Sequence, residues 1–209
     1  MEVRKFKEAF DRIAANVNSV IHGKDDVVRM ALVAVFADGH VLFEDVPGVG
    51  KSMLARALSM TMGAQSSRIQ CTPDMLPGDI TGSTIVEAKT MKFSFRPGPV
   101  FTNVLLVDEI NRATPKTQSA LLECMAERTV TIDGVSHELP QPFLVLATQN
   151  PVEQAGTFPL PEAQLDRFLL KLSVGYPDRE DEADILFANA KSEAITRLDN
   201  IVDIDTVIS

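Results

Sequence analysis

The sequence predicts an α/β domain built on a parallel five-stranded sheet that is flanked by helices and carries inserted β-hairpins. Three observations support this prediction. Strand-like and helix-like segments alternate along the chain, which is the order that a parallel sheet requires. The aliphatic runs at residues 104–107 and 143–147 lack polar alternation, so they suit strands buried on both faces. A glycine-rich loop joins a short apolar run to a helical segment.

The chain begins with two helical segments. Apolar residues recur every three or four positions from Phe6 to Val20, which is the period of an amphipathic helix. Gly23 interrupts this pattern, and residues 27–36 are predicted to form a second, largely buried helix. Further helices are predicted at residues 52–62, at residues 115–127 with Thr114 as N-cap, and at residues 161–167.

Short apolar runs between these helices predict the five strands. They cover residues 41–43, 68–71, 104–107, 143–147 and 169–174. Two other segments alternate in polarity on both sides of a turn, namely residues 82–101 and residues 128–139 around Asp133-Gly134. We predict that both are β-hairpins inserted into the α/β core.

The charge balance argues against a protein that binds nucleic acid through a basic surface. Lys and Arg total 20 and Asp and Glu total 29, so the formal net charge is -9. Cys71 and Cys124 lack metal-type spacing, which predicts two buried thiols in a reducing compartment. The N-terminus lacks the apolar segment of a signal peptide. No apolar run is close to the length of a membrane-spanning helix, which is about 20 residues. A cytoplasmic protein is therefore expected.

The glycine-rich loop has the chemistry of a phosphate-binding loop. Backbone N–H groups at a helix N-terminus bind phosphate oxygens, and glycines leave room for that approach. Lys51 would contact the β- and γ-phosphates, and the Ser52 hydroxyl would bind Mg²⁺. Asp45 replaces the first glycine of the usual pattern and is interpreted as a loop-shaping residue. The predicted site for ATP or ADP comprises Pro47, Gly48, Val49, Gly50, Lys51, Ser52 and Met53.

A second chemical signal is the pair of carboxylates that ends the aliphatic run at residues 104–107. The sequence VLLVDEIN matches a Walker B element, and ligand sites in parallel sheets lie at the carboxyl ends of the strands. Asp108 would hold Mg²⁺, and Glu109 would polarise the attacking water as general base. Alone, the two residues would equally suit a solvated strand end.

Two later residues are open to more than one interpretation. Asn150 follows the strand at residues 143–147, and its amide could bind a γ-phosphate and a water molecule, or it could simply form a turn before Pro151. Arg167 ends a short predicted helix, where it could reach a phosphate of a neighbouring subunit or interact with the helix dipole.

At this point the motifs resemble those of AAA+ ATPases, most closely the MoxR family. The resemblance extends along nearly the whole chain as an ordered set of motifs. They are GHVLFEDVPGVGKS, IQCTPDMLPGDITG, FRPGPVF, LLVDEINRATPKTQSALLECMAERTVTIDG, ATQNP and FPLPEAQLDRF.

The resemblance implies roles for particular residues. Asn150 matches the sensor-1 position and Arg167 the arginine finger, while Arg112 lies where an interface arginine is expected. The segment that packs near adenine in this family matches Ile21, His22 and Gly23. The hairpin at residues 82–101 matches the family's helix-2 insert.

The resemblance also implies a domain plan and a function. Residues 1–38 would be N-terminal helices, residues 39–176 the AAA+ nucleotide-binding core, and residues 177–209 the truncated start of a helical lid. The implied function is Mg-dependent ATP hydrolysis by a ring, expected to be a hexamer. Such a ring would remodel or activate a protein client in the manner of a chaperone, and that client could carry a von Willebrand factor A domain.

Two other functions stay open at this stage. One is a nucleotide-gated binding module without significant turnover, and the other is a nucleic-acid-linked motor subunit, which the net charge disfavours. Among the weaker signals, Met91, Phe93 and Phe95 alternate on one hairpin arm, where they could pack on the domain or contact a pore or client. His40 and His137 are expected to be structural.

Overall fold

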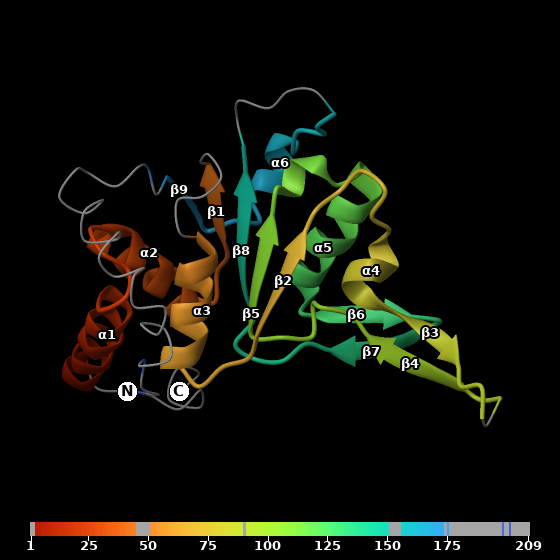
Figure 1. Cartoon of the computed structure of the whole chain (residues 1–209), viewed down its shortest axis with the longest axis horizontal. Helices are drawn as coiled ribbons and strands as arrows, with labels where there is room; N and C mark the ends of the chain where they lie inside the picture. Colours follow the sequence, from red (N-terminus) through yellow and green to blue (C-terminus); the bar gives the residue numbers. More distant parts are fainter. Residues whose placement is uncertain are drawn as a thin grey trace, which may run out of the picture.

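A computed structural model describes residues 3–44, 51–89, 91–150, 156–173, 175, 198 and 201. Its centre is a five-stranded parallel sheet with the strand order β2-β5-β8-β1-β9 (Figure 1). The strands are β1 Val41–Glu44, β2 Ser66–Gln70, β5 Val104–Asp108, β8 Leu144–Gln149 and β9 Leu170–Leu172. The predicted fold class is therefore confirmed, with each of the five predicted strands present and shifted by a few residues at its ends.

Helices cover both faces of the sheet (Figure 1). The helices α1 Val3–Asn18, α2 Asp25–Phe36 and α3 Lys51–Thr61 share one hydrophobic core with the strands. A second core contains residues of α4 Pro77–Thr81 and α5 Pro115–Glu127. Strand β5 contributes to both, because Val104 and Leu106 lie in the first core and Leu105 and Val107 in the second. The continuous aliphatic run of β5 is thus explained by burial on both faces.

Three short helical segments differ from the sequence-based expectations. The helix α4 and the 3-10 turn η1 Ile110–Arg112 were not predicted, because neither is long enough to show a periodic pattern. The helix α6 Glu162–Leu165 is shorter than the predicted residues 161–167. Phe168, three residues beyond the end of α6, is buried in the second core.

Both predicted hairpins are present. One pairs β3 Gly82–Val86 with β4 Phe93–Pro97 and projects from the body, and the other pairs β6 Thr129–Ile132 with β7 Val135–Glu138 (Figure 1). At the base of the first hairpin, a Cβ atom on Gly98 would lie 2.4 Å from the backbone nitrogen of Gly82. The two backbone segments therefore approach each other more closely than a side chain at Gly98 would allow.

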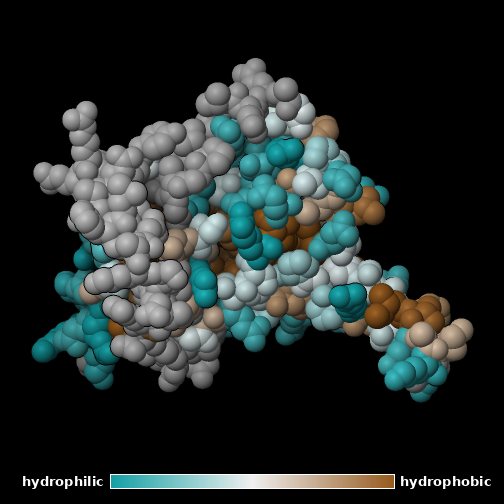
Figure 2. Space-filling view, viewed as in Figure 1, coloured by the Kyte–Doolittle hydropathy of each residue, from teal (hydrophilic) through white to brown (hydrophobic). Residues whose placement is uncertain are grey.

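The three apolar residues of the β4 arm have different surroundings. Phe95 stacks on His137 of the other hairpin, with ring centroids 4.1 Å apart, so the two hairpins pack against each other. Met91 and Phe93 are 75% and 78% exposed and lie towards the hairpin tip, where Figure 2 shows a hydrophobic group. Of the two alternatives for this arm, packing on the domain therefore applies to Phe95, whereas Met91 and Phe93 are exposed.

Two smaller expectations concern the cysteines and the membrane. Cys71 and Cys124 are buried free thiols, and burial raises the pKa of each to about 12. None of the helices in the described part of the chain is long and apolar enough to cross a membrane. The predicted division into three domains stays a prediction, and most of residues 177–209 lie outside the described residues.

Candidate nucleotide-binding site

The predicted chemical residues converge on one edge of the sheet. The strands β1, β5 and β8 are parallel neighbours, so their carboxyl ends lie together (Figure 1). Asp108 is the last residue of β5, and Asn150 directly follows β8. Lys51 begins α3, on the segment that leaves β1. Sequence segments that are far apart are therefore brought to a common edge, as expected for a ligand site in a parallel sheet.

The phosphate-binding loop is described only from Lys51 onwards. Lys51 is 7% exposed, whereas the next two residues, Ser52 and Met53, are exposed on the first turn of α3. Pro47, Gly48, Val49 and Gly50 lie outside the described residues, as does Asp45. Their predicted contacts with phosphate stay predictions.

Asp108 is held by an arginine that the sequence-based reasoning missed. The Arg68 Nε atom lies 2.7 Å from the Asp108 Oδ2 atom, and the Asp108 side chain is only 13% exposed. The parallel register aligns Arg68 with Leu106, so the long arginine side chain extends towards the carboxyl end of β5 to reach the carboxylate. The only feature of the sequence that could have indicated this contact is a charged residue on the edge strand beside the predicted Walker B strand.

Glu109 is held through both its backbone and its side chain. It adopts the left-handed conformation, with φ 55° and ψ 52°. Its backbone N–H donates a hydrogen bond to the Thr148 hydroxyl at 3.0 Å, and the Arg112 Nη1 atom lies 3.0 Å from its Oε2 atom. Arg112, which the family resemblance suggested as an interface arginine, thus forms an ion pair within its own chain.

Hydrogen bonds also hold the backbone beside the sensor-1 position. The Asn111 side-chain amide donates to the carbonyl oxygen of Asn150 at 3.4 Å, and the carbonyl oxygen of Asn111 accepts from the Phe158 N–H at 2.6 Å. The buried Gln118 side chain donates to the carbonyl oxygens of Phe158 and Ile110. These contacts join η1, α5 and the segment after β8 into one polar network behind the carboxylates.

Glu44 ties three strands together at the same edge. Its carboxylate accepts a hydrogen bond from the Gln149 side chain of β8 and lies 2.7 Å from the Lys171 Nζ atom of β9. Gln149 directly precedes Asn150, so this carboxylate supports the strand end that carries the predicted sensor-1 residue. Glu44, which precedes the glycine-rich loop, therefore stabilises the edge of the sheet at which the candidate site lies.

Arg167 is separated from these carboxylates. It is exposed and lies two residues beyond the end of α6. Among the described residues, no hydrogen bond or ion pair links it to Asp108 or Glu109. The helix-dipole interpretation of Arg167 is weakened because α6 ends before it, and its predicted role as an arginine finger would require a neighbouring subunit.

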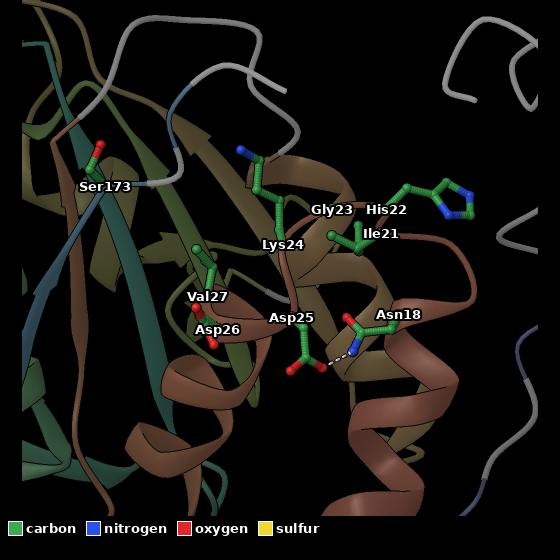
Figure 3. A pocket seen from close by; sticks show the side chains of 9 residues that line it. All are labelled: Asn18, Ile21, His22, Gly23, Lys24, Asp25, Asp26, Val27 and Ser173. Atoms are coloured by element: carbon green, nitrogen blue, oxygen red, sulfur yellow. Dashed lines mark hydrogen bonds between the residues drawn. The ribbon is translucent and has the colours of Figure 1, made fainter. Parts of the chain in front are cut away.

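The segment expected near adenine lines a pocket. Figure 3 shows this pocket, of about 620 Å³, between the α1–α2 connection and the end of β9. Its lining residues are Asn18, Ile21, His22, Gly23, Lys24, Asp25, Asp26, Val27 and Ser173. Gly23 has φ 69°, a conformation that glycine adopts without strain, and this allows the tight connection between the two helices.

The donor set suits Mg²⁺ better than a transition metal. No group of three or more His, Cys, Asp or Glu residues that could hold a metal occurs in the part of the chain that the structure describes. Mg²⁺ prefers oxygen ligands and takes few of them from the protein, because water and phosphates supply the others. The Ser52 hydroxyl and the Asp108 carboxylate, both predicted from the sequence, have the required chemistry.

Comparison with known proteins identifies the family. The ATPase family associated with various cellular activities (AAA) matches residues 40–170, which include the loop, the carboxylates and Arg167. The chain belongs to this family. Its resemblance to MoxR proteins is also confirmed, since it is 49% identical over 177 residues to the chaperone MoxR1 of Mycobacterium tuberculosis. It is 56% identical over 187 residues to the uncharacterised protein YeaC of Bacillus subtilis.

The AAA fold is also found in a solved structure. The crystal structure of a candidate ATPase from Cytophaga hutchinsonii superimposes with a TM-score of 0.87 at 40% identity, covering 100% of this chain and 65% of that one. The matches to YeaC and MoxR1 cover 90% and 85% of this chain but only 58% and 47% of those proteins. The AAA chain therefore spans about half the length of these curated relatives.

Proposed function

We propose that this AAA chain binds Mg·ATP at the carboxyl edge of its sheet and hydrolyses it. The observation that carries the proposal is the position of Asp108, the last residue of β5, and of Glu109, which follows it, at the edge where Lys51 begins α3. A buried lysine and two differently held carboxylates at one edge suit phosphoryl transfer, in which positioning and electrostatics provide most of the catalysis.

In the proposed reaction, each residue has a separate task. Lys51 neutralises charge on the β- and γ-phosphates, while Ser52 and Asp108 hold Mg²⁺, which supplies further charge neutralisation when bound. Glu109 accepts a proton from water as the water oxygen attacks the γ-phosphorus. The bond from that phosphorus to the oxygen bridging to the β-phosphate breaks, and ADP leaves with the bonding electrons. Asn150 orients the water and the γ-phosphate through its amide.

Arg167 completes the proposed site from a neighbouring subunit. A guanidinium forms two parallel hydrogen bonds to phosphate, and Arg167 is exposed and separate from the carboxylates of its own chain. This division predicts a ring, which we propose to be a hexamer. The base of ATP would occupy the pocket lined by Ile21, His22 and Gly23.

The client is proposed from the relatives. MoxR1 is named a chaperone, and we propose that this chain likewise couples ATP hydrolysis to remodelling or activation of a protein complex. A client with a von Willebrand factor A domain remains our proposal. A cytoplasmic location is also proposed, which agrees with the two buried free thiols.

Glu109→Gln tests the catalytic proposal. Because the amide cannot accept the water's proton, turnover should fall by about 10²–10⁴-fold while ATP binding is kept. Steady-state phosphate release and equilibrium binding of a fluorescent ATP analogue measure the two quantities. Glu138→Gln, which removes an exposed carboxylate on β7, is the matched control and should leave both unchanged. Normal turnover in Glu109→Gln would refute the assignment of Glu109 as the general base, whereas negligible turnover in the unmodified chain would favour the nucleotide-gated module.

Mixing two inactive variants tests the shared site. In a ring, the Arg167 of a Glu109→Gln subunit can serve the intact Glu109 of an Arg167→Ala subunit. The mixture should therefore recover turnover that neither variant shows alone, and the recovery should increase with protein concentration. Recovery that is absent in an assembled mixture would show that Arg167 does not act in trans. DNA-stimulated turnover with a steep salt dependence would instead support the nucleic-acid motor.

A further inference from the structure

Thr148 lies between the two carboxylates of the proposed active site. It is on β8, next to β5, and the register pairs the preceding residue Ala147 with Val107, which places Thr148 level with Asp108. Its side chain is buried, with only 4% of the residue exposed. The Thr148 hydroxyl oxygen accepts the Glu109 N–H at 3.0 Å and lies 3.5 Å from the Asp108 Oδ1 atom.

The direction of these two hydrogen bonds is settled by their chemistry. The backbone N–H of Glu109 can only donate, so the threonine oxygen accepts it and its own proton is free to be donated. The Asp108 carboxylate can accept that proton, although 3.5 Å is long for such a bond. One hydroxyl thus contacts both carboxylate residues, and its stronger contact is with the backbone of Glu109.

The peptide bond between Asp108 and Glu109 is held on both sides. Its carbonyl oxygen accepts the Cys71 N–H at 2.9 Å, and its N–H donates to the Thr148 hydroxyl. Glu109 has φ 55°, a left-handed conformation that few residues other than glycine adopt. The orientation of this peptide plane, together with φ of Glu109, sets the direction in which the Glu109 side chain leaves the backbone. Strained conformations of this kind persist only where the surroundings hold them.

Arg112 provides a weaker restraint on the same residue. It binds the Glu109 carboxylate, but its own side chain is 42% exposed, so water competes for this ion pair. The backbone of Glu109 is held independently of Arg112, by a buried hydroxyl that water cannot easily replace. The Thr148 hydroxyl is therefore the stronger of the two restraints on the conformation of Glu109.

We propose that Thr148 is a positioning residue for catalysis, whose hydroxyl orients the Asp108–Glu109 peptide and thereby places Glu109 against the attacking water. This inference rests on the proposed function of Glu109. Thr148 itself touches neither the nucleotide nor the water in this proposal. It acts through the backbone of Glu109 and, to a smaller extent, through the Asp108 carboxylate.

Thr148→Val and Thr148→Ser form the decisive pair of variants. Valine keeps the shape of threonine but lacks the hydroxyl, so kcat should fall about 10- to 100-fold, as expected for a misplaced catalytic group. Binding of the fluorescent ATP analogue should stay within about threefold, because the phosphate-binding loop is unchanged. Serine retains the hydroxyl and should restore most of the lost kcat. Equal losses of kcat in both variants would overturn the proposal.

Thr61→Val controls for a general loss of stability. Thr61 is another fully buried threonine, and its hydroxyl donates to the Ala57 carbonyl oxygen at 2.8 Å and accepts from Asn16 at 2.9 Å. Its valine variant should lower the melting temperature to a similar extent but retain kcat. If Thr61→Val lowered kcat as much as Thr148→Val, the effect would be structural and the proposal would be wrong.

The outcome with Glu109→Gln separates this inference from the function on which it rests. If Glu109→Gln is inactive and Thr148→Val is fully active, the positioning role is wrong and the proposed function stands. If Glu109→Gln is active, the proposed role of Glu109 itself fails, and the positioning role of Thr148 fails with it. Amide hydrogen exchange in the unmodified chain gives a test without variants. The Glu109 amide should be protected, and exchange as fast as that of an exposed loop would contradict the hydrogen bond to Thr148.

Discussion

The two edges of the sheet use polar residues in opposite ways. At the amino edge, His40 precedes β1 and Asn103 precedes β5, and both are more than nine-tenths buried. At the carboxyl edge, Asp108 and Glu109 are paired with arginines whose side chains are 60% and 42% exposed. The polar residues of the amino edge therefore join elements from a buried position, whereas the ion pairs of the carboxyl edge are partly exposed to water.

His40 illustrates the buried kind of contact. Its Nδ1 atom accepts the Val145 N–H at 3.0 Å, so the proton of the neutral ring lies on Nε2, which donates to the Met125 carbonyl oxygen. Arg128 lies beside this ring and donates to the carbonyl oxygens of Phe143 and Asp38. The histidine and the arginine join α5 to two strands of the sheet. His40 is structural, as expected, and His137 packs in the hairpin contact described above.

The difference teaches where stability and activity reside. Breaking a buried, fully satisfied hydrogen-bond network leaves polar groups without partners, which costs about 1–3 kcal/mol for each group. An exposed ion pair contributes only about 0.2–1 kcal/mol. Changes at the amino edge should therefore reduce stability, and changes to the exposed groups of the carboxyl edge should reduce activity with little loss of stability. Four predictions test this contrast.

The largest effect is expected for Lys51→Ala at the carboxyl edge. Loss of the phosphate-binding ammonium should weaken ATP binding by at least about 100-fold, while the far-ultraviolet circular dichroism stays unchanged. Equilibrium binding of an ATP analogue measures the effect. Lys116→Ala, at an exposed position on α5, is the control and should bind normally. An unfolded Lys51→Ala chain would break the contrast between the two edges.

A large pH effect is expected from His40 at the amino edge. Burial is the main cause that lowers the pKa of His40 from 6.5 to about 4, with a further contribution from the charge of Arg128. Between these values the unfolded chain binds more protons than the folded one, so stability falls as the pH decreases from 6.5 to 4. The loss should reach about 3 kcal/mol at pH 4.

Urea denaturation across this pH range measures the effect. His40→Gln removes the titrating group, so its stability should be lower at pH 7 but should show a shallower pH dependence between 6.5 and 4. An identical slope in both proteins would assign the pH dependence to other groups and contradict the pKa of His40.

Asn103→Ala should give an intermediate loss of stability. The Asn103 side chain accepts the Gln65 N–H at 3.1 Å and donates to the carbonyl oxygens of Gln141 and Pro142. Its loss should lower the free energy of unfolding by about 2–3 kcal/mol, measured in urea. ATP binding should be unchanged for the fraction that remains folded. Reduced ATP affinity at full folding would show that the two edges are coupled.

The smallest effect on stability is expected for Arg112→Ala. Its ion pair with Glu109 is partly exposed, so the free energy of unfolding should change by less than about 1 kcal/mol. Urea denaturation of this variant beside Asn103→Ala compares the two edges directly. A larger loss for Arg112→Ala than for Asn103→Ala would reverse the contrast.

Much of the fold could be predicted from the sequence because its signals are local. The aliphatic run at residues 104–107 predicted a strand buried on both faces, and Thr114-Pro115 predicted the start of α5, where the Thr114 hydroxyl accepts the Thr117 N–H. The helix α4 was missed and α6 was predicted too long, because helices this short contain too few residues to show the periodic pattern of a helix. The burial of Phe168, just after α6, depends on residues of the second core that are distant in sequence.

The sequence by itself determined the α/β class, the five strands, the two hairpins and the residue types of the candidate site. These follow from periodicity, from turn residues and from the rule that parallel strands share a carboxyl edge. Only the tertiary structure decided which residues hold the carboxylates. Arg68, Thr148 and Arg112 reach Asp108 and Glu109 through strand register and a left-handed backbone turn, and two of these three are distant in sequence from their partners. Contacts between such distant residues arise from strand pairing and packing, so no local pattern specifies them.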